Sequence, residues 1–143
     1  MKPLVLPLLM LKGRGSKKKG TFKESYVVPS WNHLYIIRNN RPILDKYATS
    51  HKNTLVKLCT EWLQDSSWKP TVNTKVIVRI MVFWPDLRKR DAHNLDKLVL
   101  DAMEEAGLFD NDACALVRYM DISVDRENPR LEITLEKGGS MPS

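Results

Sequence analysis

Alternation between apolar and polar positions predicts strands in the second half of the chain. The clearest is residues 75–83, where Val76, Val78 and Ile80 share one face and the residues between them share the other. Residues 131–135 alternate in the same way, and we expect a further strand over residues 116–124. These three segments predict a small sheet.

Apolar residues at helical spacing predict two helices. Residues 50–64 place one apolar face on Leu55, Leu58, Cys59 and Trp62. Residues 94–106 carry a second apolar stripe, which consists of Leu95, Leu98, Val99, Ala102, Met103 and Ala106. Gly107 follows directly, at the position where a left-handed C-terminal cap is expected.

The first part of the chain predicts shorter elements. Residues 26–28 resemble the end of a strand that stops at the turn-forming cluster 29–32. Residues 34–37 and 41–44 flank Asn39-Asn40, which predicts a hairpin. The apolar residues 1–11 are too few to span a bilayer, so we interpret them as a strand plus loop or as a poorly ordered leader.

Together these elements predict an α+β fold, with a small mixed β-sheet and two α-helices packed against it. We expect three parts along the chain. Residues 1–25 form a basic leader with a strand and a flexible loop, residues 26–137 form one folded domain, and residues 138–143 form a disordered tail.

The charge of the chain suggests a polyanionic partner. Its 143 residues carry a formal net charge of +6 and give an isoelectric point of about 9.4. Nucleic acid is the commonest partner of a small basic domain, although a solvated basic surface without a partner has the same composition. The run Lys17, Lys18 and Lys19 lies in a glycine-containing segment and is a candidate phosphate contact, or else an ordinary solvated loop.

The cysteines and the hydropathy pattern give expectations about the compartment. Cys59 and Cys114 are far apart and form no C-x-x-C pair, which argues against a zinc ribbon or a redox motif. No segment predicts a transmembrane helix. We therefore expect a cytoplasmic protein with no membrane partner.

Residues 88–112 carry the candidate chemistry. One aspartate lies near the start of the predicted helix and another just after its end, and basic residues surround the first. In chain order the candidates are Arg88, Lys89, Arg90, Asp91, His93, Asn94, Lys97 and Asp112. Carboxylates hold Mg²⁺ or Mn²⁺ through few direct bonds and several waters, and such a metal polarises phosphate and lowers the pKa of bound water. A nearby lysine stabilises the extra negative charge of the transition state. The segment thus suggests phosphodiester cleavage, provided that the chain after Gly107 brings Asp112 back toward Asp91.

Each of these residues also has a purely structural interpretation. Asp91 is a typical helix N-cap, and Lys97 is spaced to pair with Asp101 one turn later. The segment 110–112 also opens like a calcium-binding loop. Its sixth and twelfth positions are Ala115 and Asp121 instead of glycine and glutamate, which excludes an EF-hand.

The combined pattern resembles the RusA family of Holliday junction resolvases. Residues 90–103, read as RDAHNLDKLVLDAM, followed by Gly107 and Asp112, are similar to the family signature R-D-x-D-N-x-x-K, a D-A-L-like step, a glycine and D-D. The segment Pro29-Ser30-Trp31-Asn32 resembles the family segment P-S-x-N. The resemblance covers roughly residues 26–135.

The resemblance implies a RusA-like fold and a homodimeric, Mg²⁺-dependent (or Mn²⁺-dependent) endonuclease, often carried by prophages, that acts on four-way DNA junctions in recombination and repair. It implies Asp91, Lys97 and Asp112 as catalytic residues. The metal would be held by Asp91, His93 and Asp112. Beside the motif residues Asn32 and Asn94, we expect DNA contacts from basic side chains, namely Lys17, Lys18, Lys19, Arg88, Lys89 and Arg90.

Two positions depart from the family pattern. His93 stands where the family has its second aspartate, and Asn111 stands where it has the first of the paired aspartates. A histidine still offers a ring nitrogen to a metal, whereas it also suits a helix flank. These departures keep open a module that binds branched DNA without cutting it, and an RNA- or protein-binding domain is a third interpretation.

Overall fold

The computed structural model describes residues 1–8 and 46–143 in full, and only the backbone of short strands between them. These strands pair antiparallel: β2 (Leu11–Lys12) with β5 (Tyr26–Val27), β3 (Ser16–Lys18) with β4 (Thr21–Lys23), and β6 (Tyr35–Arg38) with β7 (Arg41–Leu44). The hairpin predicted around Asn39-Asn40 is thereby confirmed. Lys17 and Lys18 lie in β3 with their side chains undescribed, and Lys19 and Asn32 fall outside the described residues, so the expected DNA contacts of these four residues stay predictions.

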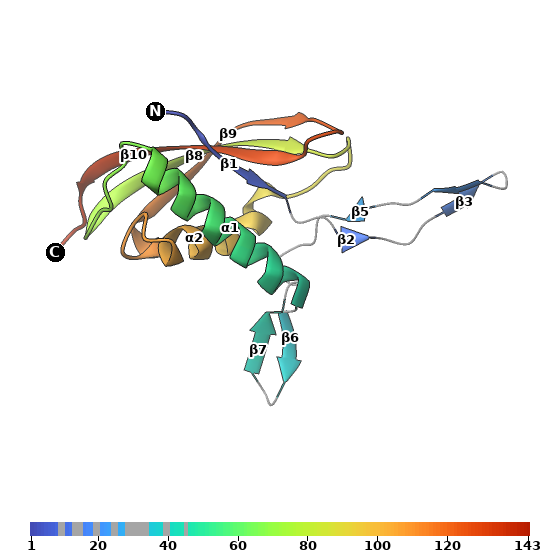
Figure 1. The fold of residues 1–143 in the computed structure, drawn as a ribbon, viewed down its shortest axis with the longest axis horizontal. Helices are drawn as coiled ribbons and strands as arrows, with labels where there is room; N and C mark the ends of the chain where they lie inside the picture. The colour runs from blue at the N-terminus through green and yellow to red at the C-terminus, as the bar shows by residue number, and fades with distance from the viewer. Residues whose placement is uncertain are drawn as a thin grey trace.

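One four-stranded sheet organises the described part of the chain (Figure 1). Its order is β1 (Leu4–Pro7), β10 (Arg130–Ser140), β8 (Thr74–Trp84) and β9 (Ala115–Val124). β8 runs parallel to β9, whereas the other two pairs are antiparallel. The sheet is therefore mixed, as predicted.

Two helices, α1 (Lys46–Asp65) and α2 (Asp96–Glu105), contact each other and lie on one side of the sheet (Figure 1). The alternation in β8 explains this arrangement. Val76, Val78, Ile80 and Val82 are buried, whereas Ile77, Arg79 and Met81, which alternate with them, are only partly covered or exposed. Leu55 and Cys59 of α1 and Ala102 and Met103 of α2 are buried in the same core. Burial of this apolar surface is the main source of stability for the predicted α+β fold.

The opposite side of the sheet has no helix against it among the described residues. Apolar side chains from three strands are exposed there: Val5 by 45%, Met81 by 38% and Leu116 by 42%. We call this surface the open face. Arg79 of β8 also lies on the open face, where it forms an ion pair with Glu136 of the neighbouring strand β10.

The start of the second predicted helix differs from the expectation. A 3-10 helix, Ala92–Leu95, precedes α2, and the left-handed residue after α2 is Gly107 with φ of 88°, as the sequence predicted. The first helix begins at Lys46 and is longer than predicted at its start.

The predicted boundaries at the two ends of the chain need correction. Leu4 and Leu6 of β1 are fully buried beside β10, so this part of residues 1–25 belongs to the domain's own sheet. β10 continues through Gly138 to Ser140, within the tail that we expected to be disordered. A Cβ atom on Gly138 would lie 2.9 Å from the Cβ of Lys75, so glycine permits this close approach of the strands. In the described part of the chain, no helix is long and apolar enough to cross a membrane.

Candidate active site

The loop before α2 positions Asp91. Its backbone is extended, and its Oδ1 accepts a hydrogen bond from the backbone N–H of His93 at 3.0 Å. Asp91 therefore caps the 3-10 helix, as its structural interpretation predicted. Because the cap uses one carboxylate oxygen and the residue is exposed, this role does not exclude a second role toward metal or DNA.

His93 points outward at the same turn. Its side chain is 71% exposed, with Nδ1 lying 3.4 Å from Oδ2 of Asp96. The edge of its ring meets the ring of Tyr119, with 5.0 Å between centroids. Asn94, in the same 3-10 helix, is half-buried and its backbone N–H bonds to the carbonyl of Asp91 at 3.2 Å.

Tyr119 joins β9 to the start of the helical segment. Its hydroxyl donates to the backbone carbonyl of Ala92 at 2.8 Å and also bonds to the carboxylate of Asp96. Burial and the Asp96 carboxylate raise the pKa of Tyr119, so the hydroxyl keeps its proton at neutral pH. This contact ties β9 to the start of the helical segment, whereas the approach of Asp112 to Asp91 that we expected from the sequence stays a prediction.

Lys97, in the first turn of α2, contacts an aspartate that follows the end of this helix. Its Nζ lies 2.9 Å from Oδ1 of Asp101 and 3.6 Å from Oδ2 of Asp112. The backbone N–H of Asp112 donates to Oε1 of Glu104 at 2.9 Å, which fixes the short connection after α2 against the helix. Of the predicted catalytic residues, the structure therefore places Lys97 and Asp112 in contact.

An acidic cluster surrounds this contact. Asp101, Glu104 and Asp112 each offer a carboxylate oxygen within 4.8 Å of the others, and all three are half-buried. Among the described residues it is the one group of three such ligands, and it includes neither Asp91 nor His93. Carboxylate oxygens at this spacing suit a hard divalent cation that keeps several waters.

Sequence reasoning assigned Asp101 only as a partner of Lys97 and did not include Glu104. The signal was present in the sequence. Asp101 and Glu104 lie four and seven residues after Lys97, and residues at these spacings share one face of a helix. What the spacing did not reveal is that the chain after Gly107 returns to this same face.

The paired-aspartate position has a structural role in this chain. Asn111 accepts from the backbone N–H of Ala113 at 2.8 Å and so caps the 3-10 helix Asp112–Cys114. Asp110 turns away from this cap, with its Oδ2 accepting from the backbone N–H of Asn73 at 3.0 Å. Among these three residues, only Asp112 contributes to the acidic cluster.

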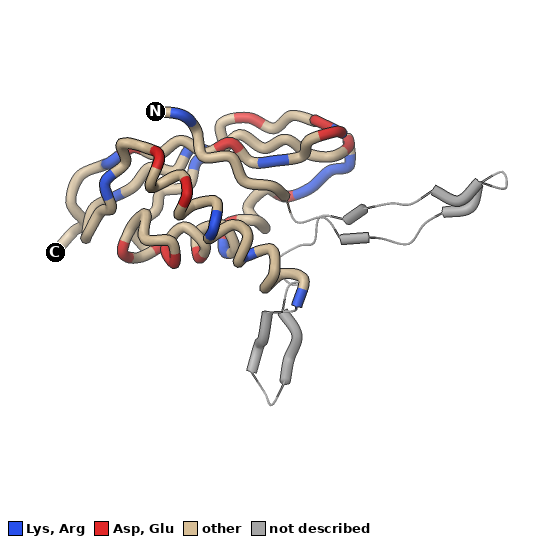
Figure 2. The backbone as a smooth tube through the Cα atoms, viewed as in Figure 1, with Lys and Arg blue, Asp and Glu red and all other residues tan. Residues whose placement is uncertain are grey.

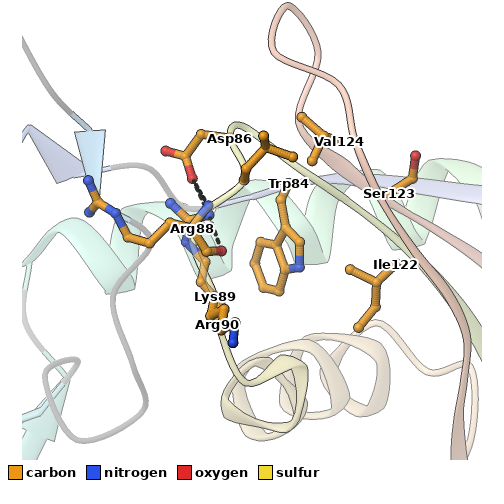
Figure 3. A pocket seen from close by; sticks show the side chains of 9 residues that line it. Trp84, Asp86, Arg88, Lys89, Arg90, Ile122, Ser123 and Val124 are labelled. Carbon is orange, nitrogen blue, oxygen red and sulfur yellow. Dashed lines mark hydrogen bonds and ion pairs between the residues drawn. The ribbon is translucent and has the colours of Figure 1, made fainter.

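A basic loop, which we define as residues 86–90, leads from β8 into this site (Figure 3). Asp86 orders it by accepting from the backbone N–H of Arg88 at 2.9 Å and from Nη1 of Arg90 at 2.7 Å. The bond from Arg90 is the main reason why the pKa of Asp86 is lowered. Arg88 and Lys89 are exposed, whereas the Arg90 side chain is only 9% exposed and lies over the ring of Trp84.

Basic and acidic side chains are separated along this part of the chain. Figure 2 shows acidic positions along α2 and a basic stretch in the loop before it. A basic stretch of this type attracts polyanions, whereas an acidic cluster repels phosphate unless a cation neutralises it. The two regions are adjacent in sequence, because Arg90 directly precedes Asp91.

Comparison with known proteins identifies the family of this chain. The family model of Endodeoxyribonuclease RusA matches residues 25–136. The crossover junction endodeoxyribonuclease RusA of Shigella sonnei (strain Ss046) is 26% identical over 113 residues, which cover 78% of this chain and 90% of the relative. The protein of the same name from Escherichia coli (strain K12) has the same identity and coverage. Because the family match spans well over half of the chain and includes both helices, this chain belongs to the RusA endodeoxyribonuclease family.

Proposed function

We propose that this protein is a metal-dependent endonuclease that resolves four-way (Holliday) DNA junctions. The observation that carries the proposal is the contact of Lys97 with Asp112 inside the cluster of Asp101, Glu104 and Asp112. Membership of an endodeoxyribonuclease family and the names of its relatives support the substrate. The net charge of +6 supports a nucleic-acid partner.

The donor set fits Mg²⁺ or Mn²⁺. Asp112 belongs both to the metal ligands predicted from the sequence and to the acidic cluster, so we propose it as the central ligand. Asp91 and His93 would complete the site from the helix start, or Asp101 and Glu104 from the helix face. A divalent cation bound there would supply the positive charge that activates water and polarises the phosphate.

The protein's own residues would then act as follows. Lys97 would stabilise the negative charge that develops on the phosphate in the transition state, since its side chain is half-exposed and its ammonium group lies beside Asp112. Arg88 and Lys89 would hold the DNA backbone, with Asn94 close to the helix start. Arg90 would act mainly by shaping the loop, because its guanidinium is committed to Asp86 and Trp84.

We also propose a homodimer. A four-way junction has two equivalent strands to cut, and a two-fold dimer presents two equivalent sites. The open face suits a second copy, since it carries exposed apolar residues together with charges of both signs, including Arg79 and Glu136.

The free, buried cysteines Cys59 and Cys114 fit a reducing compartment, so we propose a cytoplasmic location.

The test is to incubate the protein with an end-labelled four-way junction, with and without Mg²⁺ or Mn²⁺, beside a duplex of the same sequence. Metal-dependent nicks near the crossover of the junction, and none in the duplex, support the proposal. Tight junction binding without nicks at any metal concentration would instead identify a branched-DNA-binding module. No preference for the junction over the duplex would contradict both assignments.

A further inference from the structure

We propose that a groove beside the active-site helix holds an unstacked base of the DNA strand that is being cut. This inference rests on the proposed function. The groove lies between the end of β8, the basic loop and the end of β9 (Figure 3). Its volume of about 480 Å³ lies within the range of small-ligand pockets and exceeds the needs of one nucleobase.

The lining of the groove has the apolar character that a base requires. Trp84 and Val124 form its inner part, and Ile122 stands at its side with 55% of its surface exposed. Leu87, at the tip of the basic loop, is 78% exposed. Apolar side chains next to cationic ones on a DNA-binding surface typically contact the faces of unstacked bases.

The rim of the groove supplies the charge that the flanking phosphates require. Arg88 and Lys89 are exposed on the basic loop, and neither forms an ion pair with any carboxylate in residues 1–8 or 46–143. Asp86 orders the loop by accepting a hydrogen bond from the backbone N–H of Arg88 and forms its ion pair with Arg90. The two cations are therefore available to phosphates on either side of a base in the groove.

The lining of the groove also includes a buried hydrogen-bond donor that lacks an acceptor. The Arg90 side chain is more than nine-tenths buried and lines the groove, and its Nη2 has no hydrogen-bond partner among the described residues. A buried guanidinium N–H without an acceptor is costly. The carbonyl or ring nitrogen on the edge of a base is the type of acceptor that arginine recognises in DNA.

The position of the groove connects it to the reaction. On the loop side, Arg90 directly precedes Asp91. On the strand side, Ile122 lies three residues after Tyr119, whose hydroxyl donates to the backbone carbonyl of Ala92. A nucleotide in the groove would thus lie next to the helix start where Asp91 stands. Bases at a junction crossover are less firmly stacked than bases in a duplex, which lowers the cost of displacing one.

The test uses a four-way junction that carries the fluorescent base 2-aminopurine at successive positions near the crossover, with Ca²⁺ in place of the active metal. Fluorescence of the wild-type complex should rise at one position, because an unstacked 2-aminopurine is no longer quenched by its neighbours. Ile122→Asn should abolish the rise and weaken junction binding about tenfold. Ile122→Val should keep both, and Val72→Asn, at an apolar residue that is 75% exposed elsewhere, is the matched control.

A second substrate separates this inference from the proposed function. A duplex with one extrahelical 2-aminopurine should bind more tightly than the fully paired duplex, and Ile122→Asn should remove that preference. If the protein neither binds nor cuts junctions, the proposed function fails. A preference for the duplex with the extrahelical base would still support base binding in the groove. Cleavage of junctions with no fluorescence change at any position, or an Ile122→Asn response equal to that of the wild type, would overturn the groove alone.

Discussion

Lys97 is the residue on which the candidate site depends most. It contacts carboxylates from two parts of the chain, Asp101 on α2 and Asp112 just after it. Removal of the ammonium group leaves three carboxylates facing one another without a cation. Lys97→Ala should therefore slow cleavage by about 100-fold, as expected for loss of a group that stabilises transition-state charge.

Separate removal of each carboxylate identifies the metal ligands. Asp112→Asn should abolish cleavage and keep junction binding, because it removes a ligand and also reduces repulsion of the phosphates. Asp91→Asn should do the same. If the helix face completes the site, Asp101→Asn and Glu104→Gln should lower metal affinity as well, measured by calorimetric titration with Mn²⁺.

The control for these variants is Asp121→Asn, which changes an exposed carboxylate of β9 outside the cluster. It should leave cleavage unchanged. Wild-type cleavage by either Asp91→Asn or Asp112→Asn would contradict the proposed site.

His93 gives a prediction about metal preference. Mg²⁺ prefers hard oxygen ligands, whereas Mn²⁺ accepts imidazole more readily. If His93 is a ligand, cleavage should favour Mn²⁺ over Mg²⁺, and His93→Asp should shift this preference toward Mg²⁺. Cleavage is measured against metal concentration for the wild type, His93→Asp and His93→Ala. Identical metal curves for the wild type and His93→Ala would assign the exposed imidazole to the helix flank alone.

At the scale of elements, periodicity predicted the parts that bury one regular face. β8 and α2 were predicted closely because alternating or helical burial repeats over their whole length. The 3-10 helix before α2 and the late end of β10 were not, since both depend on single contacts. One is the cap made by Asp91, and the other is the close approach of Gly138 to Lys75.

The same reason limits what the sequence said about the site. Spacing placed Lys97 and Asp101 together because both lie on one helix. The contact with Asp112 depends on the turn at Gly107 and on the hydrogen bond from the backbone N–H of Asp112 to Glu104. Tertiary contacts of this type leave no periodic signal.

Gly107 tests the importance of that turn. Its φ of 88° is favourable for glycine and strained for alanine, so Gly107→Ala should lower the free energy of unfolding by about 1 kcal/mol. Gly139→Ala is the matched control, because a Cβ atom there meets nothing within 4 Å. Chemical denaturation of the two variants and the wild type measures the difference. Equal losses for the two variants would contradict the importance of the left-handed turn.

For the whole molecule, the open face of the sheet is the surface through which we propose that the homodimer forms. Helices cover one side only among the described residues, and apolar side chains such as Met81 and Leu116 are exposed on the other. Leu116→Asp should shift the protein from dimer to monomer in sedimentation experiments, because it places an unpaired charge in an apolar contact. Val72→Asp, at an exposed site away from the sheet face, should remain dimeric. A wild-type monomer with full activity would contradict the dimer.

The most direct test of the central claim is cleavage of a supercoiled plasmid that extrudes a cruciform, which contains a four-way junction. A dimeric resolvase with two active sites should convert it to linear DNA through paired nicks in opposite strands, only when Mg²⁺ or Mn²⁺ is present. Asp112→Asn should bind the cruciform and leave the plasmid supercoiled. Metal-independent cutting, or equal cutting of a plasmid without the cruciform, would contradict the assignment of this protein as a junction-resolving endonuclease.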